Sequence, residues 1–182
     1  MTPYATVLFL HFVGLIGLFI GYGLEWVASS ALRRAITGDQ ARTWLGVYRL
    51  SLPISGPAVL LLILTGGYLA SVINAMKQGW LFASILAIVI ALLMGFMLLM
   101  PRMKDIRASL PEGSAPLSAE VLARVRQPFI VTLVRIRTTL AVGIVYLMTM
   151  KPETSGALIA LCVAIFIGVL FAAPTFAKRQ SA

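Results

Sequence analysis

Residues 8–26 read LFLHFVGLIGLFIGYGLEW, and this stretch decides the fold because it places ionisable side chains inside an apolar segment. A helix of about 20 apolar residues is long enough to cross the hydrocarbon core of a bilayer. The stretch contains the single histidine of the chain, His11, and near its end the acidic residue Glu25. Because an ionisable group within a membrane is costly, each of these residues is expected to have a definite partner or role.

The composition of the 182-residue chain is that of a membrane protein. Hydrophobic residues make up 60% of the chain, charged residues only 12%, and the mean hydropathy is +0.97. A soluble domain of this length cannot bury so much apolar surface. The net charge of +9 does not indicate nucleic-acid binding, because the basic residues lie in short runs between apolar segments. The single cysteine, Cys162, excludes an intramolecular disulfide and a cysteine-rich metal site.

Five apolar segments predict an all-α fold, a single transmembrane domain built as a five-helix bundle. They cover residues 4–32, 52–75, 80–100, 128–150 and 155–177. Of the 15 lysines and arginines, 13 lie in alternate loops, at the foot of the fourth segment and in the tail, which predicts a periplasmic N-terminus and a cytoplasmic C-terminus. We therefore expect a multi-pass protein of the bacterial cytoplasmic (inner) membrane.

Two cytoplasmic connections follow from this topology. Residues 33–49 are polar and contain Gly38–Asp39, so we expect a short turn between helices there. Residues 101–127 form the longer loop, in which Ser118 is a candidate N-cap for a short helix, AEVLARVRQ. A loop of this length cannot bury a core of its own, so any chemistry should lie within or at the rim of the bundle.

Small residues at four-residue spacing predict close helix packing. Gly17 and Gly21 form a GxxxG pair in the first segment. Similar stripes run through the third and fifth segments, as Ala83, Ala87, Ala91 and Gly95, and as Ala160, Ala164, Gly168 and Ala172.

A first candidate site surrounds His11, which lies about 10 Å below the outer helix end at 1.5 Å per residue. Gly66, Gly67, Tyr146 and Met148 fall at a similar depth in other segments. Imidazole and thioether groups are ligands for haem iron or copper, so His11 and Met148 are the candidate metal ligands. Tyr146 is a second candidate on the opposite side, and Gly66–Gly67 would clear space for a macrocycle such as haem b. Two alternatives stay open: His11 fixes helix packing through a hydrogen bond, or it belongs to a proton or ion pathway.

A second constellation lies at the cytoplasmic end of the bundle. Glu25 is the one acid inside a predicted span, and Arg135 and Arg137 fall at a similar depth in the fourth segment. We expect a charge pair between Glu25 and one of the two arginines, with a structural role.

Short motifs across most of the chain resemble a group of small bacterial membrane proteins. They are Leu10–His11 with Gly14, Thr65–Gly66 with Tyr68–Leu69, Trp80–Leu81, and the sequence YLMTMKP at residues 146–152. The group includes the membrane domain of the copper-resistance D family, HemJ-type protoporphyrinogen oxidases, and a predicted integral membrane protein family of unknown function. The YLMTMKP ending most resembles the last of these.

The resemblance has uneven implications for function. In HemJ-type proteins a first-helix histidine is associated with haem, and His11 matches it. Those proteins also carry a lysine after the third-helix tryptophan, and Ser84 stands at the matching position, which argues against protoporphyrinogen oxidation. A copper site would need several methionine or histidine ligands together, and only His11, Met148 and Cys162 converge by depth.

Two functions of different classes are therefore expected. The first is a membrane protein that binds haem or a porphyrin through His11, in a redox or haem-handling role. The second is a non-enzymatic bundle that transports a small solute or serves as an accessory subunit of a larger complex. The expected partners are the lipid bilayer and either another membrane protein or a second copy of the chain. No nucleic-acid partner is expected.

Overall fold

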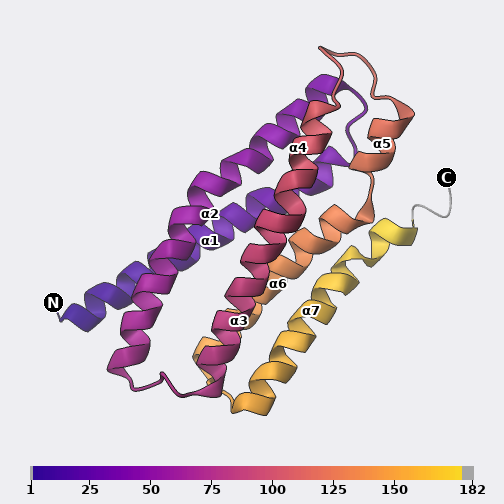
Figure 1. The fold of residues 1–182 in the computed structure, drawn as a ribbon. Helices are drawn as coiled ribbons and strands as arrows, with labels where there is room; N and C mark the ends of the chain where they lie inside the picture. The colour runs from indigo at the N-terminus through magenta and orange to yellow at the C-terminus, as the bar shows by residue number, and fades with distance from the viewer. Residues whose placement is uncertain (1, 178–182) are drawn as a thin grey trace.

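The computed structural model describes residues 2–177, and all of their regular secondary structure is helical (Figure 1). Within these residues five helical segments are long and apolar enough to span a membrane, as the sequence predicts. They are α1 (Pro3–Leu32), α2 (Gly38–Val72), a third segment made of α3 (Gly79–Leu93), η1 (Met94–Leu99) and α4 (Met100–Ala108), then α6 (Pro128–Met150) and α7 (Thr154–Ala177). A short helix, α5 (Ala119–Val125), precedes α6.

The bundle is organised around α6, which contacts α1, α3 and α7. In the apolar window of the segment that contains α6, 56% of the residues are buried, against 22–28% in the other four segments. Helices α1 and α2 form an antiparallel hairpin beside it, and α5 lies at the end of the bundle where α1 ends and α2 begins (Figure 1). We call this the basic end, because most of the arginines and lysines of the chain lie there.

Glycines hold α1 against α2. A Cβ added at Gly21 would lie 2.7 Å from the Ser55 Cβ, and one added at Gly17 would lie 3.1 Å from the Ala58 Cβ. A Cβ at Gly14 would also meet α2. The missing side chains therefore allow the two backbones to approach closely, which is the packing function of a GxxxG pair.

The main departure from the predicted elements is the start of α2. Residues 33–49 are not a turn, because the helix already begins at Gly38, where the Thr37 hydroxyl accepts a hydrogen bond from the Gln40 amide. Ala41 and Leu45 lie one turn apart and are both buried, so they extend the apolar stripe of the helix beyond the membrane span. The polar residues Arg42 and Thr43 between them conceal this stripe in the sequence.

The loop between α4 and α6 completes a core at the basic end. It contains α5, whose N-cap is Ser118 as predicted, since the Ser118 hydroxyl accepts a hydrogen bond from the Val121 amide at 3.3 Å. Arg42 donates hydrogen bonds to the carbonyls of Pro111 and Gly113, which holds the loop on the start of α2. Apolar residues of the loop and of the neighbouring helix ends then form one buried cluster, which includes Leu32, Leu45, Leu99, Ile106, Leu117, Val121 and Val125.

Candidate functional site

A buried ion pair joins α1 to α6. The Arg137 Nη1 atom donates to the Glu25 Oε2 atom at 2.5 Å, and the two side chains are only 8% and 6% exposed. The Ser51 hydroxyl of α2 lies 3.2 Å from the other carboxylate oxygen. The Ser51 hydroxyl has one proton, and the Tyr48 carbonyl lies closer to it, at 2.7 Å, so Arg137 is the principal partner of the buried carboxylate.

The π-helix η1 makes room for the arginine of this pair. A π-helical turn is rare and marks functional sites more often than ordinary helix does. Here it brings Gly95 against the guanidinium, where an added Cβ would lie 3.0 Å from Arg137 Nη2. The Arg137 Nε atom donates to the Ala91 carbonyl at 3.1 Å, and the guanidinium lies over the ring of Tyr22, 4.7 Å from its centroid. Arg137 is thus held by α1, α3 and η1 together.

Arg135, the other predicted partner of Glu25, points elsewhere. Its guanidinium lies over the ring of Trp26, 5.0 Å from the centroid. Residues two apart on a helix are rotated by about 200°, so only one of Arg135 and Arg137 can face Glu25. The structure selects Arg137.

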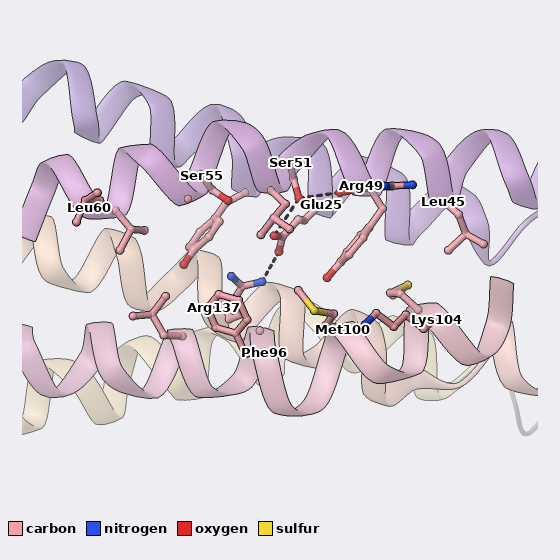
Figure 2. Close-up of a pocket in the computed structure, with 18 of the residues that line it drawn as sticks. Glu25, Leu45, Arg49, Ser51, Ser55, Leu60, Phe96, Met100, Lys104 and Arg137 are labelled. Carbon is pink, nitrogen blue, oxygen red and sulfur yellow. Dashed lines mark hydrogen bonds and ion pairs between the residues drawn. The ribbon is translucent and has the colours of Figure 1, made fainter. Parts of the chain in front are cut away.

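A cleft of about 720 Å³ lies beside the ion pair (Figure 2). Its volume is in the range of small-molecule binding sites. One wall belongs to α2, and the opposite wall to α3, η1 and α4. The α2 wall includes Leu45, Leu52, Ser55, Gly56, Val59, Leu60 and Ile63, and the opposite wall includes Leu92, Gly95, Phe96, Met100, Met103, Lys104 and Arg107.

The cleft is elongated, and its two ends differ in charge. On α2 its lining extends from Leu45 to Ile63, about 27 Å along the helix axis. Figure 2 shows Leu60 toward one end and Arg49 and Lys104 toward the other, with the ion pair between them. The residues at the basic end therefore give an otherwise apolar cleft a positively charged terminus.

The cleft also opens sideways onto the surface that would face lipid. Leu52, Leu60 and Phe96 line it, yet their exposed fractions are 46%, 58% and 55%. Exposed apolar side chains at the rim of a membrane-spanning bundle contact acyl chains. The cleft is therefore open along the side between α2 and η1.

His11 lies outside this cleft and contacts α2 directly. Its Nδ1 atom is 2.8 Å from the Thr65 hydroxyl, which itself donates to the Leu61 carbonyl at 2.6 Å. The hydroxyl oxygen must then accept a hydrogen bond from Nδ1–H, which leaves Nε2 as the unprotonated ring nitrogen. A Cβ at Gly66 would lie 3.3 Å from the His11 ring. The space that Gly66 clears is therefore occupied by the imidazole itself.

The structure does not gather the other predicted residues of the His11 site into one pocket. Gly67 is exposed, and a Cβ there would meet nothing within 4 Å. Tyr146 is 48% exposed, and Met148 packs against a separate cluster formed by α3, α6, α7 and the end of α2. Among residues 2–177 no three histidine, cysteine, aspartate or glutamate side chains lie close enough together to hold a metal ion.

The sequence reading missed most of the residues that line the cleft. One signal was present, because Ser55 and Gly56 stand between two prolines at a depth close to that of Glu25. Small and helix-disfavouring residues inside a span often line a cavity. The opposite wall had no such signal, since Phe96 and Met100 read as ordinary apolar residues of a span.

Comparison with known proteins places the chain in a family but gives it no function. The family described as predicted integral membrane protein (DUF2269) matches residues 5–152, so the protein belongs to this family. No curated protein matches the chain, and neither does any solved structure. The copper-resistance D and HemJ-type part of the resemblance gains no support from these comparisons.

Proposed function

We propose that this protein binds an amphiphilic molecule with an acidic head group and an apolar tail, which enters the cleft from the bilayer. The observation that carries the proposal is the elongated cleft, apolar along most of its length and cationic at its basic end. This role is non-enzymatic and belongs with the carrier or accessory-subunit class expected from the sequence.

The apolar part of the cleft supports the tail. Residues from Leu52 to Ile63 on α2 face Leu92 and Phe96 across it, and Ser55 is the one polar side chain that α2 contributes to the lining over this stretch. A hydrocarbon tail needs no hydrogen bonds and gains contact area in such a slot. The lateral opening lets the tail enter without crossing water.

The basic end supports the acidic head. Arg49, Lys104 and Arg107 line it, and the one acid in the lining, Glu25, is already paired with Arg137. The three cations therefore have no counter-charge in the cleft. A carboxylate or phosphate is the chemical group that these side chains bind best. The basic residues of loops on one side of a membrane protein also predict that this end faces the cytoplasm.

The ion pair supports the walls of the cleft. Glu25 and Arg137 lie midway along it and connect α1 to α6, and the Arg137 guanidinium also contacts α3 and Gly95 of η1, so we expect the pair to fix the positions of the helices that form the walls.

A fluorescent fatty acid, cis-parinaric acid, tests the proposal on the purified full chain in detergent. Gly56 lines the cleft, and a Cβ there meets nothing within 4 Å, so Gly56→Trp should fill the cleft without strain in the helix. We expect about a tenfold or greater loss of affinity. Gly67→Trp is the matched control, because Gly67 lies in the same helix with equally open surroundings but outside the cleft. Equal binding by both variants would reject the cleft as the site.

The head group is tested with the methyl ester of the same probe. The double variant Lys104→Gln and Arg107→Gln should weaken binding of the acid by roughly tenfold, the effect of losing charged hydrogen bonds. Binding of the uncharged ester should not change. If acid and ester lose affinity equally, the basic end does not recognise charge.

Haem b bound through His11 is our second candidate. Its support is the hydrogen bond from Nδ1 to Thr65, because a metal-ligating histidine usually donates its other ring N–H in this way. His11 would be the one protein ligand, without Tyr146 or Met148. Protein purified from cells supplied with haem precursor should show a Soret band that His11→Ala abolishes. A colourless protein would exclude this role.

A further inference from the structure

Three arginines from separate elements gather at the basic end, outside the cleft. Arg33 follows α1, Arg126 follows α5, and Arg135 belongs to α6. None of them lines the cleft. None takes part in the ion pairs found among residues 2–177, which join other residues. The group thus carries three positive charges, and none of them has a carboxylate partner within residues 2–177.

Two nitrogen atoms of this group are buried without an acceptor in the described part of the chain. They are Arg33 Nη1 and Arg135 Nε. The Arg33 Nη2 atom reaches the Thr175 carbonyl of α7, at a long distance of 3.4 Å. A charged donor that is buried without a partner is destabilising, so it usually indicates a bound water or ion.

The charges of the group oppose one another. Burial lowers the pKa of Arg33, and the nearby guanidinium groups of Arg135 and Arg126 lower it further. An anion from outside the chain would relieve this repulsion.

The surroundings of the group are typical of a membrane interface. The Arg135 guanidinium lies over Trp26, whose ring meets Phe171 of α7 edge to face at 5.9 Å between centroids. Phe171 is 53% exposed on the apolar surface. Tryptophan is enriched where acyl chains give way to head groups, which is the depth of a lipid phosphate.

We propose that Arg33, Arg126 and Arg135 form a binding site for the phosphate of an anionic phospholipid. Guanidinium groups bind phosphate through paired N–H donors, and this group brings three guanidinium groups close together. The exposed apolar face of α7 would carry the acyl chains. A zwitterionic lipid has the same phosphate, but its head-group cation would meet three arginines. The site is separate from the cleft and does not depend on its proposed ligand.

Native mass spectrometry of the delipidated full chain in detergent tests the site. Phosphatidylglycerol should bind at one site at least tenfold more tightly than phosphatidylcholine. Inorganic phosphate at the same concentration should not displace it. If inorganic phosphate displaces the lipid from this site, the occupant is a free anion and the lipid assignment is overturned.

Variants identify the residues. Arg33→Gln and Arg135→Gln should each weaken phosphatidylglycerol binding by about tenfold or more. The matched control is Arg124→Gln, since Arg124 is an exposed arginine at the same end that pairs with Glu120. Should a buried variant fail to fold, the exposed Arg126→Gln variant replaces it. Unchanged affinity in Arg126→Gln and in whichever buried variant folds would overturn the site.

A cleft variant separates the two proposals. Gly56→Trp should retain full phosphatidylglycerol binding while it loses cis-parinaric acid. Loss of phosphatidylglycerol in Gly56→Trp, with no loss in Arg33→Gln, would place the lipid in the cleft and overturn the arginine site.

Discussion

Replacing Glu25 by glutamine should destabilise the protein strongly, because it leaves the Arg137 guanidinium buried without a counter-charge. That side chain is 8% exposed, and its remaining partners are the Ala91 carbonyl and the Tyr22 ring. Removing one member of a buried ion pair typically costs about 3–5 kcal/mol. Glutamine keeps an oxygen within reach of Arg137, so we expect a loss near 3 kcal/mol, or about a 150-fold change in the unfolding equilibrium.

The loss is measured by titration of the protein from mild detergent into sodium dodecyl sulfate, with tryptophan fluorescence as the signal. The double variant Glu25→Gln with Arg137→Met should recover most of the stability, because it removes both charges. Stability losses that are independent add up, so recovery reveals coupling between the two residues. We expect a coupling free energy of about 2 kcal/mol or more.

The exposed pair of Glu120 and Arg124 is the matched control for this measurement. Its side chains are 75% and 45% exposed, so Glu120→Gln should change the free energy of unfolding by no more than about 0.5 kcal/mol. If Glu25→Gln is as mild as this control, or if the coupling is below about 0.5 kcal/mol, the ion pair does not hold the bundle together as argued.

Three further predictions concern single positions. Gly21→Ala should lower the free energy of unfolding by about 2 kcal/mol in the same detergent titration, because its Cβ would lie 2.7 Å from that of Ser55. Gly23→Ala is its control and should be neutral or stabilising, because a Cβ at Gly23 meets nothing within 4 Å. Gly95→Ala should cost about 1 kcal/mol through its contact with Arg137, and a double-mutant cycle should show no cost in an Arg137→Met background. Thr65→Val should cost about 1–3 kcal/mol because it leaves the His11 Nδ1 donor without a partner, and an unchanged midpoint of unfolding would contradict that bond.

Segment length and hydropathy predicted the last two spans closely, but the third helical segment continues to Ala108, eight residues past its predicted end. Helix α6 occupies residues 128–150, which are the predicted bounds, and α7 begins one residue earlier than predicted. The prediction also failed at the basic end of α2. There the helix extends beyond the apolar run, and only a narrow stripe of apolar residues, which includes Ala41 and Leu45, is buried. It also did not foresee η1, since nothing in MGFMLL distinguishes a π-helical turn from an α-helical one.

The candidate site was predictable only in part. Depth counting brought Glu25 to the level of two arginines, because rise per residue is a property of any helix. It could not choose between Arg135 and Arg137, since the rotation of α6 depends on its neighbours. The same counting placed Met148 and Tyr146 level with His11, yet equal depth on different helices says nothing about which sides face each other.

The sequence by itself determined that this protein has five helices able to span a membrane, and that their charged connections gather on one side. These properties follow from local composition, because the length and polarity of each segment decide whether it can lie in lipid. Only the tertiary structure decided that Glu25 pairs with Arg137, that His11 Nδ1 forms a hydrogen bond with the Thr65 hydroxyl, and that a cleft separates α2 from η1. Those features arise between segments far apart in the chain, and their geometry depends on how each helix is rotated and where its backbone departs from the regular α-helix.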